Sequence, residues 1–140
     1  MGKTKSWKDR LNSSNHPEVK TLTFKFAGLS PNTKMLVSTP KEINQWVRSI
    51  PQGETRTVSE LKQALATGHG ADAACPASTM IFLRIVAEVA WDELEEGADP
   101  KDVTPFWRIV EPESKLAKKL RCGTEYIARM RQFESGNPGI

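Results

Sequence analysis

Residues 75–94 read CPASTMIFLRIVAEVAWDEL, and this unusually apolar stretch decides the fold. The Cys75-Pro76 step predicts the start of a helix, because proline is favoured at the first helical position. The apolar residues that follow cover so wide a surface that we expect this helix to be largely buried. They are Met80, Ile81, Leu83, Ile85, Val86, Val89, Ala90 and Leu94.

Two amphipathic helices are predicted before this segment. The first begins at Thr39-Pro40, with the hydroxyl as N-cap, and Pro51 and Gly53 end it. Its inward stripe consists of Ile43, Trp46, Val47 and Ile50. The second begins at Thr57 or Ser59 and ends at Gly68-His69-Gly70, with Val58, Leu61 and Leu65 facing inward.

The remaining segments predict smaller elements. Residues 7–11 suit a short helix that docks late or frays, because Trp7 and Leu11 are spaced one turn apart. Residues 20–26 alternate and predict a half-buried strand or an extended arm, with Leu22, Phe24 and Phe26 on one face. Residues 35–37 predict a short strand, and 104–110 have the composition of another, although Pro105 keeps its start out of a central ladder.

Two further elements are predicted near the end of the chain. Residues 115–120 form a basic element, and residues 124–133 an amphipathic helix with Tyr126, Ile127, Met130 and Phe133 inward. The order of helix, short turn, helix, apolar helix, strand and basic segment predicts a mainly α fold with a small β component, namely a winged helix-turn-helix. We expect an N-terminal arm over residues 1–34, the winged helix-turn-helix domain over 35–136 and a loose tail over 137–140.

Composition narrows the class of protein. The 38% of hydrophobic and 26% of charged residues are typical of a soluble globular domain, and no apolar run approaches the roughly 20 residues that cross a bilayer. Cys75 and Cys122 are too few and too far apart for a disulfide scaffold, which favours a reducing cytoplasm. His16 and His69 have no second ligand at metal spacing, so we expect no metal. We also expect no cofactor and a monomer.

Charge is distributed unevenly along the chain, although the net charge is only +3. Residues 88–102 hold seven acidic residues against Lys101 alone. Basic residues gather at both ends, namely Lys3, Lys5, Lys8 and Arg10 at the start and Lys115, Lys118, Lys119, Arg121, Arg129 and Arg131 near the end. Phosphate is therefore attracted to the two ends and repelled from the middle, although each cluster alone also suits a solvated surface.

Three blocks of sequence, in order, carry a resemblance to a known family. They are Ile50-Pro51-Gln52-Gly53-Glu54-Thr55, Pro105-Phe106-Trp107-Arg108-Ile109-Val110, and Leu120-Arg121-Cys122-Gly123 with Ser135-Gly136. Together they resemble the DNA-binding domain of the O6-alkylguanine-DNA alkyltransferases over about residues 45–136. The chain resembles most a group of small methyltransferase-family DNA-binding domain proteins, in which a KSW start, a P[YF]WR motif and a GCP-like step occur, here with Lys5-Ser6-Trp7 and Cys75-Pro76. It also resembles the small alkyltransferase-like proteins in lacking the active-site cysteine.

The resemblance implies a site that has lost its chemistry. Phe106 stands at the position of the family's nucleophilic cysteine, and phenylalanine has no lone pair with which to attack. Trp107 stands where the family's histidine takes the thiol proton, and its indole nitrogen only donates. Val58 replaces the tyrosine beside the target phosphate, and Thr79 or Met80 falls near the position of the arginine that fills the base stack. We therefore expect a protein that is not an enzyme.

The expected function is non-catalytic binding of double-stranded DNA, with alkylated or distorted bases sensed for repair and a repair protein as further partner. The resemblance and the basic residues suggest DNA contacts at Ser59, Lys62, Thr79, Arg84, Arg108, Lys115, Lys118, Lys119 and Arg121. A base pocket is expected at Val58, Pro105, Phe106 and Trp107. Two alternatives stay open: an interaction module that kept the fold without DNA binding, and an alkyltransferase using Cys75, whose thiolate a helix start would favour.

Overall fold

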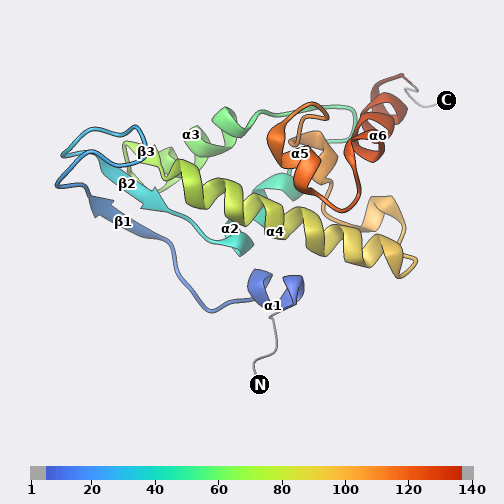
Figure 1. The fold of residues 1–140 in the computed structure, drawn as a ribbon, viewed down its shortest axis with the longest axis horizontal. Helices are drawn as coiled ribbons and strands as arrows, with labels where there is room; N and C mark the ends of the chain where they lie inside the picture. Colours follow the sequence, from blue (N-terminus) through green and yellow to red (C-terminus); the bar gives the residue numbers. More distant parts are fainter. Residues whose placement is uncertain (1–5, 137–140) are drawn as a thin grey trace.

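The computed structural model describes residues 6–136 as six α-helices, two 3-10 helices and three strands. The loose tail predicted for residues 137–140, and Lys3 and Lys5 of the N-terminal basic cluster, lie outside the described residues. Helices dominate and the sheet is small (Figure 1), so the mainly α class with a small β component is confirmed. Within the part of the chain that the structure describes, no helix is both long and apolar enough to cross a membrane.

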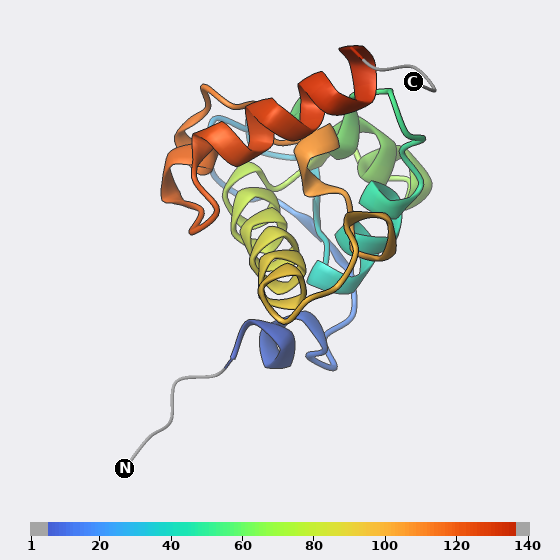
Figure 2. The same ribbon diagram turned by 90° about the vertical axis from the view of Figure 1, so that its right-hand side faces the viewer.

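The long helix α4, Pro76–Glu95, forms the centre of the molecule, as the apolar pattern predicted. Its 20 residues span about 30 Å. Residues such as Leu83, Val86 and Ala90 are almost completely buried and pack with α2. In a view nearly along α4, α1 lies on one side of this helix and α6 on the opposite side (Figure 2).

The two helices before α4 begin where their caps predicted. α2, Pro40–Arg48, has Thr39 as N-cap, whose side chain accepts a hydrogen bond from the Glu42 backbone. α3, Val58–Gly68, begins with a capping box in which Thr57 and Glu60 each bind the other's backbone N–H. Such reciprocal bonds satisfy amide groups that have no partner inside the helix. The predicted starts of both helices are therefore confirmed. Most of the predicted inward residues are buried, and two, Trp46 and Val58, are half-buried.

The sheet has the order β1-β2-β3, formed by Glu18–Thr21, Lys34–Val37 and Ala73–Ala74. β1 pairs antiparallel with β2, and β2 pairs parallel with β3. Of the two alternatives predicted for residues 20–26, the half-buried strand is wrong. The ladder between β1 and β2 ends at Thr21, and beyond it Leu22 bonds to Thr33 and Phe26 to Leu29 in a largely exposed hairpin. Phe24 and Phe26 are 65% and 41% exposed, so the alternation there does not reflect a buried face.

The strand predicted over residues 104–110 is also wrong. Residues Phe106–Arg108 form a 3-10 helix, with hydrogen bonds from the Arg108 amide to Pro105 and from the Ile109 amide to Phe106. The tight turn places two consecutive aromatic side chains in the core, which an alternating strand cannot do. Within residues 6–136 no strand follows β3, so the expected wing strand is not formed there.

The last two helices cover one side of the core. α5, Lys115–Lys119, is the predicted basic element, and α6, Thr124–Gly136, extends beyond the predicted end. Ile127 is buried, and Tyr126 and Met130 are half-buried, as expected. Phe133 is 56% exposed, so its inward placement is wrong. At the other end, α1, Trp7–Leu11, packs against α4, and α1 and β1 together attach the predicted arm to the rest of the molecule.

Candidate nucleic-acid interface

Three adjoining hollows form one groove across α3, α4 and α5. A cavity of about 310 Å³ lies between the start of α3 and the segment before α5, and its lining includes Val58, Ser59 and Met80. A second of about 320 Å³ shares Met80 and Leu116 with the first. A third of about 190 Å³ shares Ser59 with the first. We call this combined surface the basic groove.

Four cationic side chains line the basic groove. Lys62 borders the third cavity, and Arg84, Lys115 and Lys119 border the second. All four were predicted as DNA contacts from the sequence, together with Ser59, and the fold brings them together from three helices. Lys118 is exposed on α5 but does not line the groove. The cavity that Arg84, Lys115 and Lys119 line also has apolar lining residues, namely Met80, Ile81 and Leu116. It therefore offers charge for phosphates and apolar surface for sugars or bases.

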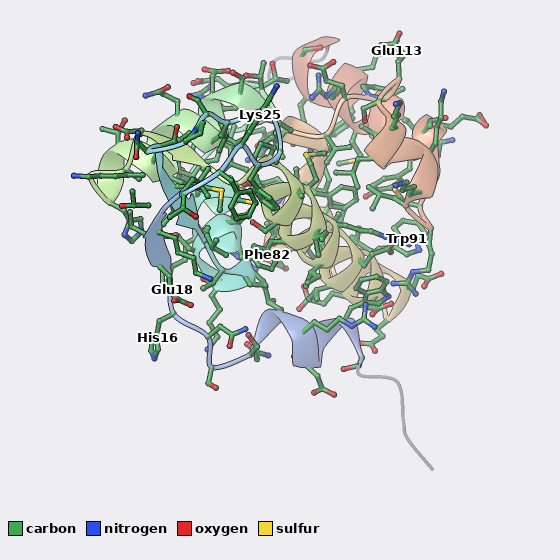
Figure 3. The ribbon with its side chains drawn as sticks, turned by 60° about the vertical axis from the view of Figure 1, so that its left-hand side comes forward. His16, Glu18, Lys25, Phe82, Trp91 and Glu113 are labelled. Carbon is green, nitrogen blue, oxygen red and sulfur yellow. The ribbon has the colours of Figure 1, made fainter. Side chains whose placement is uncertain are left out.

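Acidic side chains also border the groove and must be weighed against its cations. Glu111 lines the first cavity, and Asp72 lines the third, where its carboxylate accepts a hydrogen bond from the Lys34 amide. Glu113 is exposed and lies at the outer edge of the molecule beside α5 (Figure 3). The denser acidic run over residues 93–99 is farther away, because Arg84 and Glu95 are about 16 Å apart along α4. The groove lining therefore keeps an excess of positive charge.

Helix caps fix the ends of the groove. The capping box at Thr57 fixes the first turn of α3, which carries Val58 and Ser59. Ser114 caps α5 by accepting a hydrogen bond from the Ala117 amide, and its hydroxyl donates to the Glu111 carbonyl. The turn over residues 111–114 is therefore fixed to the helix that carries the lysines.

Three other residues predicted to contact DNA use their polar groups to bind other residues of the protein. Thr79 is 1% exposed and its hydroxyl donates to the Cys75 carbonyl at 2.7 Å. Arg108 binds both carboxylate oxygens of Glu134 and donates to the Ile50 carbonyl at 2.6 Å. The structure does not present these two side chains to a ligand, and Arg108 instead joins the Ile50-Pro51 loop to α6.

Arg121 is the third, and it is bound to acidic residues of α4. Its guanidinium donates to Glu88 at 2.7 Å and to Asp92 at 2.7 Å. Burial lowers the pKa of Arg121, but the hydrogen bonds and charges of these two carboxylates together raise it by more than burial lowers it. The net shift of the pKa is upward. Most of the donor capacity of Arg121 is therefore already used.

The residues predicted to stack on a base are core residues. Phe106 is 0% and Trp107 is 1% exposed, and Pro105 is buried beside them. The Phe106 and Trp107 rings contact each other edge to face, and both lie near Tyr126 of α6, which also contacts Trp91 (labelled in Figure 3). Stacking on a base needs an open ring face. Of the predicted base pocket, only the half-buried Val58 borders the groove.

Neither cysteine is presented as a nucleophile. Cys75 is 5% exposed, precedes α4, and makes no side-chain capping bond. Burial, followed by the charge of Glu88, raises the pKa of Cys122 to about 11. The Cys122 thiol therefore stays protonated near neutral pH.

Several polar residues of structural importance were not predicted. Glu88 is 1% exposed, yet it lies in the apolar stretch IVAEVA, and its spacing of four residues from Arg84 was a usable signal for a buried ion pair. Glu134 is the partner of Arg108, and no local pattern indicated that pairing. His69 contacts Glu42 at 2.5 Å across the ends of α2 and α3.

Within residues 6–136, no group of three or more His, Cys, Asp or Glu side chains is arranged to hold a metal ion. No protein-family model, curated protein or solved structure matches the chain. The function is therefore argued from the groove itself, with the family resemblance as an expectation.

Proposed function

We propose that this chain is a non-catalytic domain that binds double-stranded DNA through the basic groove. The observation that carries the proposal is that four cations from three helices line adjoining cavities: Arg84, Lys115 and Lys119 line one, and Lys62 lines another. The cavity between these two shares Ser59 with the cavity of Lys62, and Met80 and Leu116 with the other. Cations gathered in this way neutralise successive phosphates and release counterions, which is the main sequence-independent source of affinity for DNA.

The arrangement of α3 and α4 suits a helix-turn-helix variant. α3 would be the first helix and the N-terminal half of α4 the second, with Arg84 on the side that borders the groove. α5 would take the place of the missing wing strand and bring its lysines to the phosphate backbone of the DNA. The resemblance supports this assignment, because Ile50–Thr55 precedes α3 and the Pro105–Val110 block is packed beneath the groove through Ile109 and Val110.

The proposed role is recognition without alkyl transfer. Phe106 has no nucleophilic atom and is completely buried, and Trp107 cannot accept a proton. The cavity beside Val58 lies within the size range of small-ligand pockets and is open to the groove. We place an altered or extruded base in this cavity, with the protein marking the lesion for a repair partner.

A paired set of variants tests the groove. Lys115→Ala/Lys119→Ala removes two groove cations, whereas Lys41→Ala/Lys101→Ala removes two exposed lysines elsewhere and serves as the control. Each lost phosphate contact lowers the slope of log affinity against log salt by roughly 0.9, so the groove variant should lose roughly 1.8 in slope and roughly 30-fold in affinity at 150 mM salt. The control should bind like wild type. Equal losses in both variants would show that only net charge matters and would contradict the groove.

One observation favours the alternative of a protein-interaction module. The exposed Phe133 borders an apolar hollow of about 360 Å³ whose lining includes Met130 and Trp107. Such a surface suits an apolar side chain of a partner. If wild-type protein binds neither duplex nor single-stranded DNA at low salt, the interaction module becomes the better account.

A further inference from the structure

Three arginines surround the indole ring of Trp7 where α1 meets α4. The guanidinium carbons of Arg10, Arg84 and Arg121 lie 4.7, 5.4 and 6.0 Å from the ring centroid. These distances are within the range of cation–π attraction. A single aromatic side chain thus holds together three positive charges that come from α1, from α4 and from the segment before α6.

The acidic residues nearby neutralise mainly one of the three. Arg121 makes close ion pairs with both Glu88 and Asp92. Arg84 only reaches Glu88 at 4.0 Å, which is too long for a hydrogen bond. Its Nε atom is buried and has no hydrogen-bond partner, whereas the side chain as a whole is 40% exposed. Arg10 forms no ion pair with the residues that the structure describes. Two guanidinium groups therefore keep unused donors.

Arg84 connects this cluster to the basic groove. Its side chain is 40% exposed and lines the cavity that also contains Lys115 and Lys119. The same guanidinium faces the ring of Trp7, so positive charge continues from α5 across α4 to α1. α1 packs on α4 beside this continuation, on the side of α4 opposite α6 (Figure 2).

We propose that Arg10 and Arg84, held together on the Trp7 ring, form a second phosphate-binding point that makes α1 part of the nucleic-acid-binding surface. Planar guanidinium groups with free donors bind phosphate oxygens in a bidentate manner. Trp7 positions Arg10 for this contact, and the ion pairs of Glu88 with Arg121 leave Arg84 free to make it. The ligand is a phosphodiester group of the DNA backbone, so the assignment of the ligand rests on the proposed function.

The test compares two variants of the same helix in the full chain. Arg10→Ala removes the proposed contact, and Lys8→Ala removes an exposed charge two residues away that does not contact the Trp7 ring. Arg10→Ala should lower the salt slope for a 16-bp duplex by roughly 0.9 and the affinity by roughly 5-fold at 150 mM salt, and Lys8→Ala should change neither. Trp7→Ala should cause a loss similar to that of Arg10→Ala, and the double variant should lose little more. Equal affinity and slope for Arg10→Ala and Lys8→Ala would overturn the inference.

A second measurement separates this inference from the proposed function. If Lys115→Ala/Lys119→Ala weakens DNA binding and Arg10→Ala does not, DNA binding by the basic groove is supported and the second phosphate-binding point is refuted. If wild-type protein binds no DNA, the proposed function fails, and titration with inorganic phosphate decides the inference. The Nε–Hε NMR resonance of Arg84 should then shift on adding phosphate in wild type and not in Arg10→Ala. An unchanged wild-type resonance would overturn the site.

Discussion

Arg108→Ala should destabilise the fold more than removal of any surface cation. Arg108 and Glu134 have side chains that are only 13% and 7% exposed, joined by bonds of 2.9 and 2.8 Å, and Arg108 also donates to the Ile50 carbonyl. Removing one partner leaves a buried carboxylate without compensation, which costs about 3–5 kcal/mol of the free energy of unfolding. A domain of this size has about 5–15 kcal/mol in total, so the variant should lose a third or more of its stability.

Urea unfolding, followed by circular dichroism at pH 7, measures this loss. Arg129→Ala is the matched control, because Arg129 is an exposed arginine on α6 that forms no ion pair among the described residues. The double variant Arg108→Met/Glu134→Leu should recover much of the loss, since it leaves no charge buried. A loss below about 1 kcal/mol for Arg108→Ala, or a value equal to that of Arg129→Ala, would refute the reasoning.

The Arg108–Glu134 ion pair also predicts how the difference in free energy of unfolding between wild type and Arg108→Ala depends on pH. Burial is the largest single influence on Glu134 and raises its pKa. Hydrogen bonds from Arg108, Trp107 and the Gly53 amide, together with the charge of Arg108, lower it by more in sum, so the net value in the folded state is below the ordinary 4.5. In wild type this stabilisation is fully present above pH 4.5 and is lost as the pH falls through the lowered pKa. Without Arg108, its hydrogen bonds and charge no longer lower the pKa of Glu134, so this pKa is higher in the variant than in wild type and acid stabilises the variant relative to wild type. The difference in free energy of unfolding between wild type and Arg108→Ala should therefore become smaller as the pH falls from 7 to 4. A difference that grows would contradict the assignment to the Arg108–Glu134 ion pair.

Two further predictions concern cysteine chemistry, one at Cys122 and one at a cysteine introduced at position 106. Because burial raises the pKa of Cys122 to about 11, iodoacetamide should label this thiol of the native protein slowly at pH 7.5 and much faster above pH 10, and rapid labelling at pH 7.5 would be inconsistent with the shift. Phe106→Cys should not transfer a methyl group from an O6-methylguanine duplex, because position 106 is buried and Trp107 cannot act as general base, an aid commonly worth about 10²–10⁴ in rate. Methyl label appearing on the variant would show that the site is more intact than we infer.

The sequence predicted the helices well because their signals are local. Thr39, Thr57 and Cys75-Pro76 lie at helix starts, and helix periodicity identified the buried side of each helix. Of the three predicted strands, the one over residues 35–37 is formed within β2, and the other two predictions failed for lack of such local information. Residues 20–26 alternate, but a strand needs a partner of matching length, and β2 pairs only with Glu18–Thr21. Residues 104–110 have strand composition, but core packing of Phe106 and Trp107 selects a 3-10 turn.

The candidate site could be predicted only in part, because local sequence identifies exposed cations but not the distant residues that bind some of them. Exposed cations such as Lys115 and Lys119 are on the surface in almost any fold, so their choice needed only charge patterning. Arg108 and Arg121 could not be separated from them, because their acceptors Glu134 and Glu88 are 26 and 33 residues away in the sequence. The position of Arg10 beside Arg84 likewise depends on how α1 packs, which no local pattern encodes.

Duplex binding measured as a function of salt tests the central claim most directly. Fluorescence anisotropy with a 16-bp duplex, with and without one O6-methylguanine, should give a straight line of log affinity against log salt. Four groove cations in contact with phosphates predict a slope of roughly −3.6, and the proposed lesion sensing predicts tighter binding of the methylated duplex at every salt concentration. Absence of binding at 50 mM salt, or an affinity that does not change with salt, would contradict DNA binding by the basic groove.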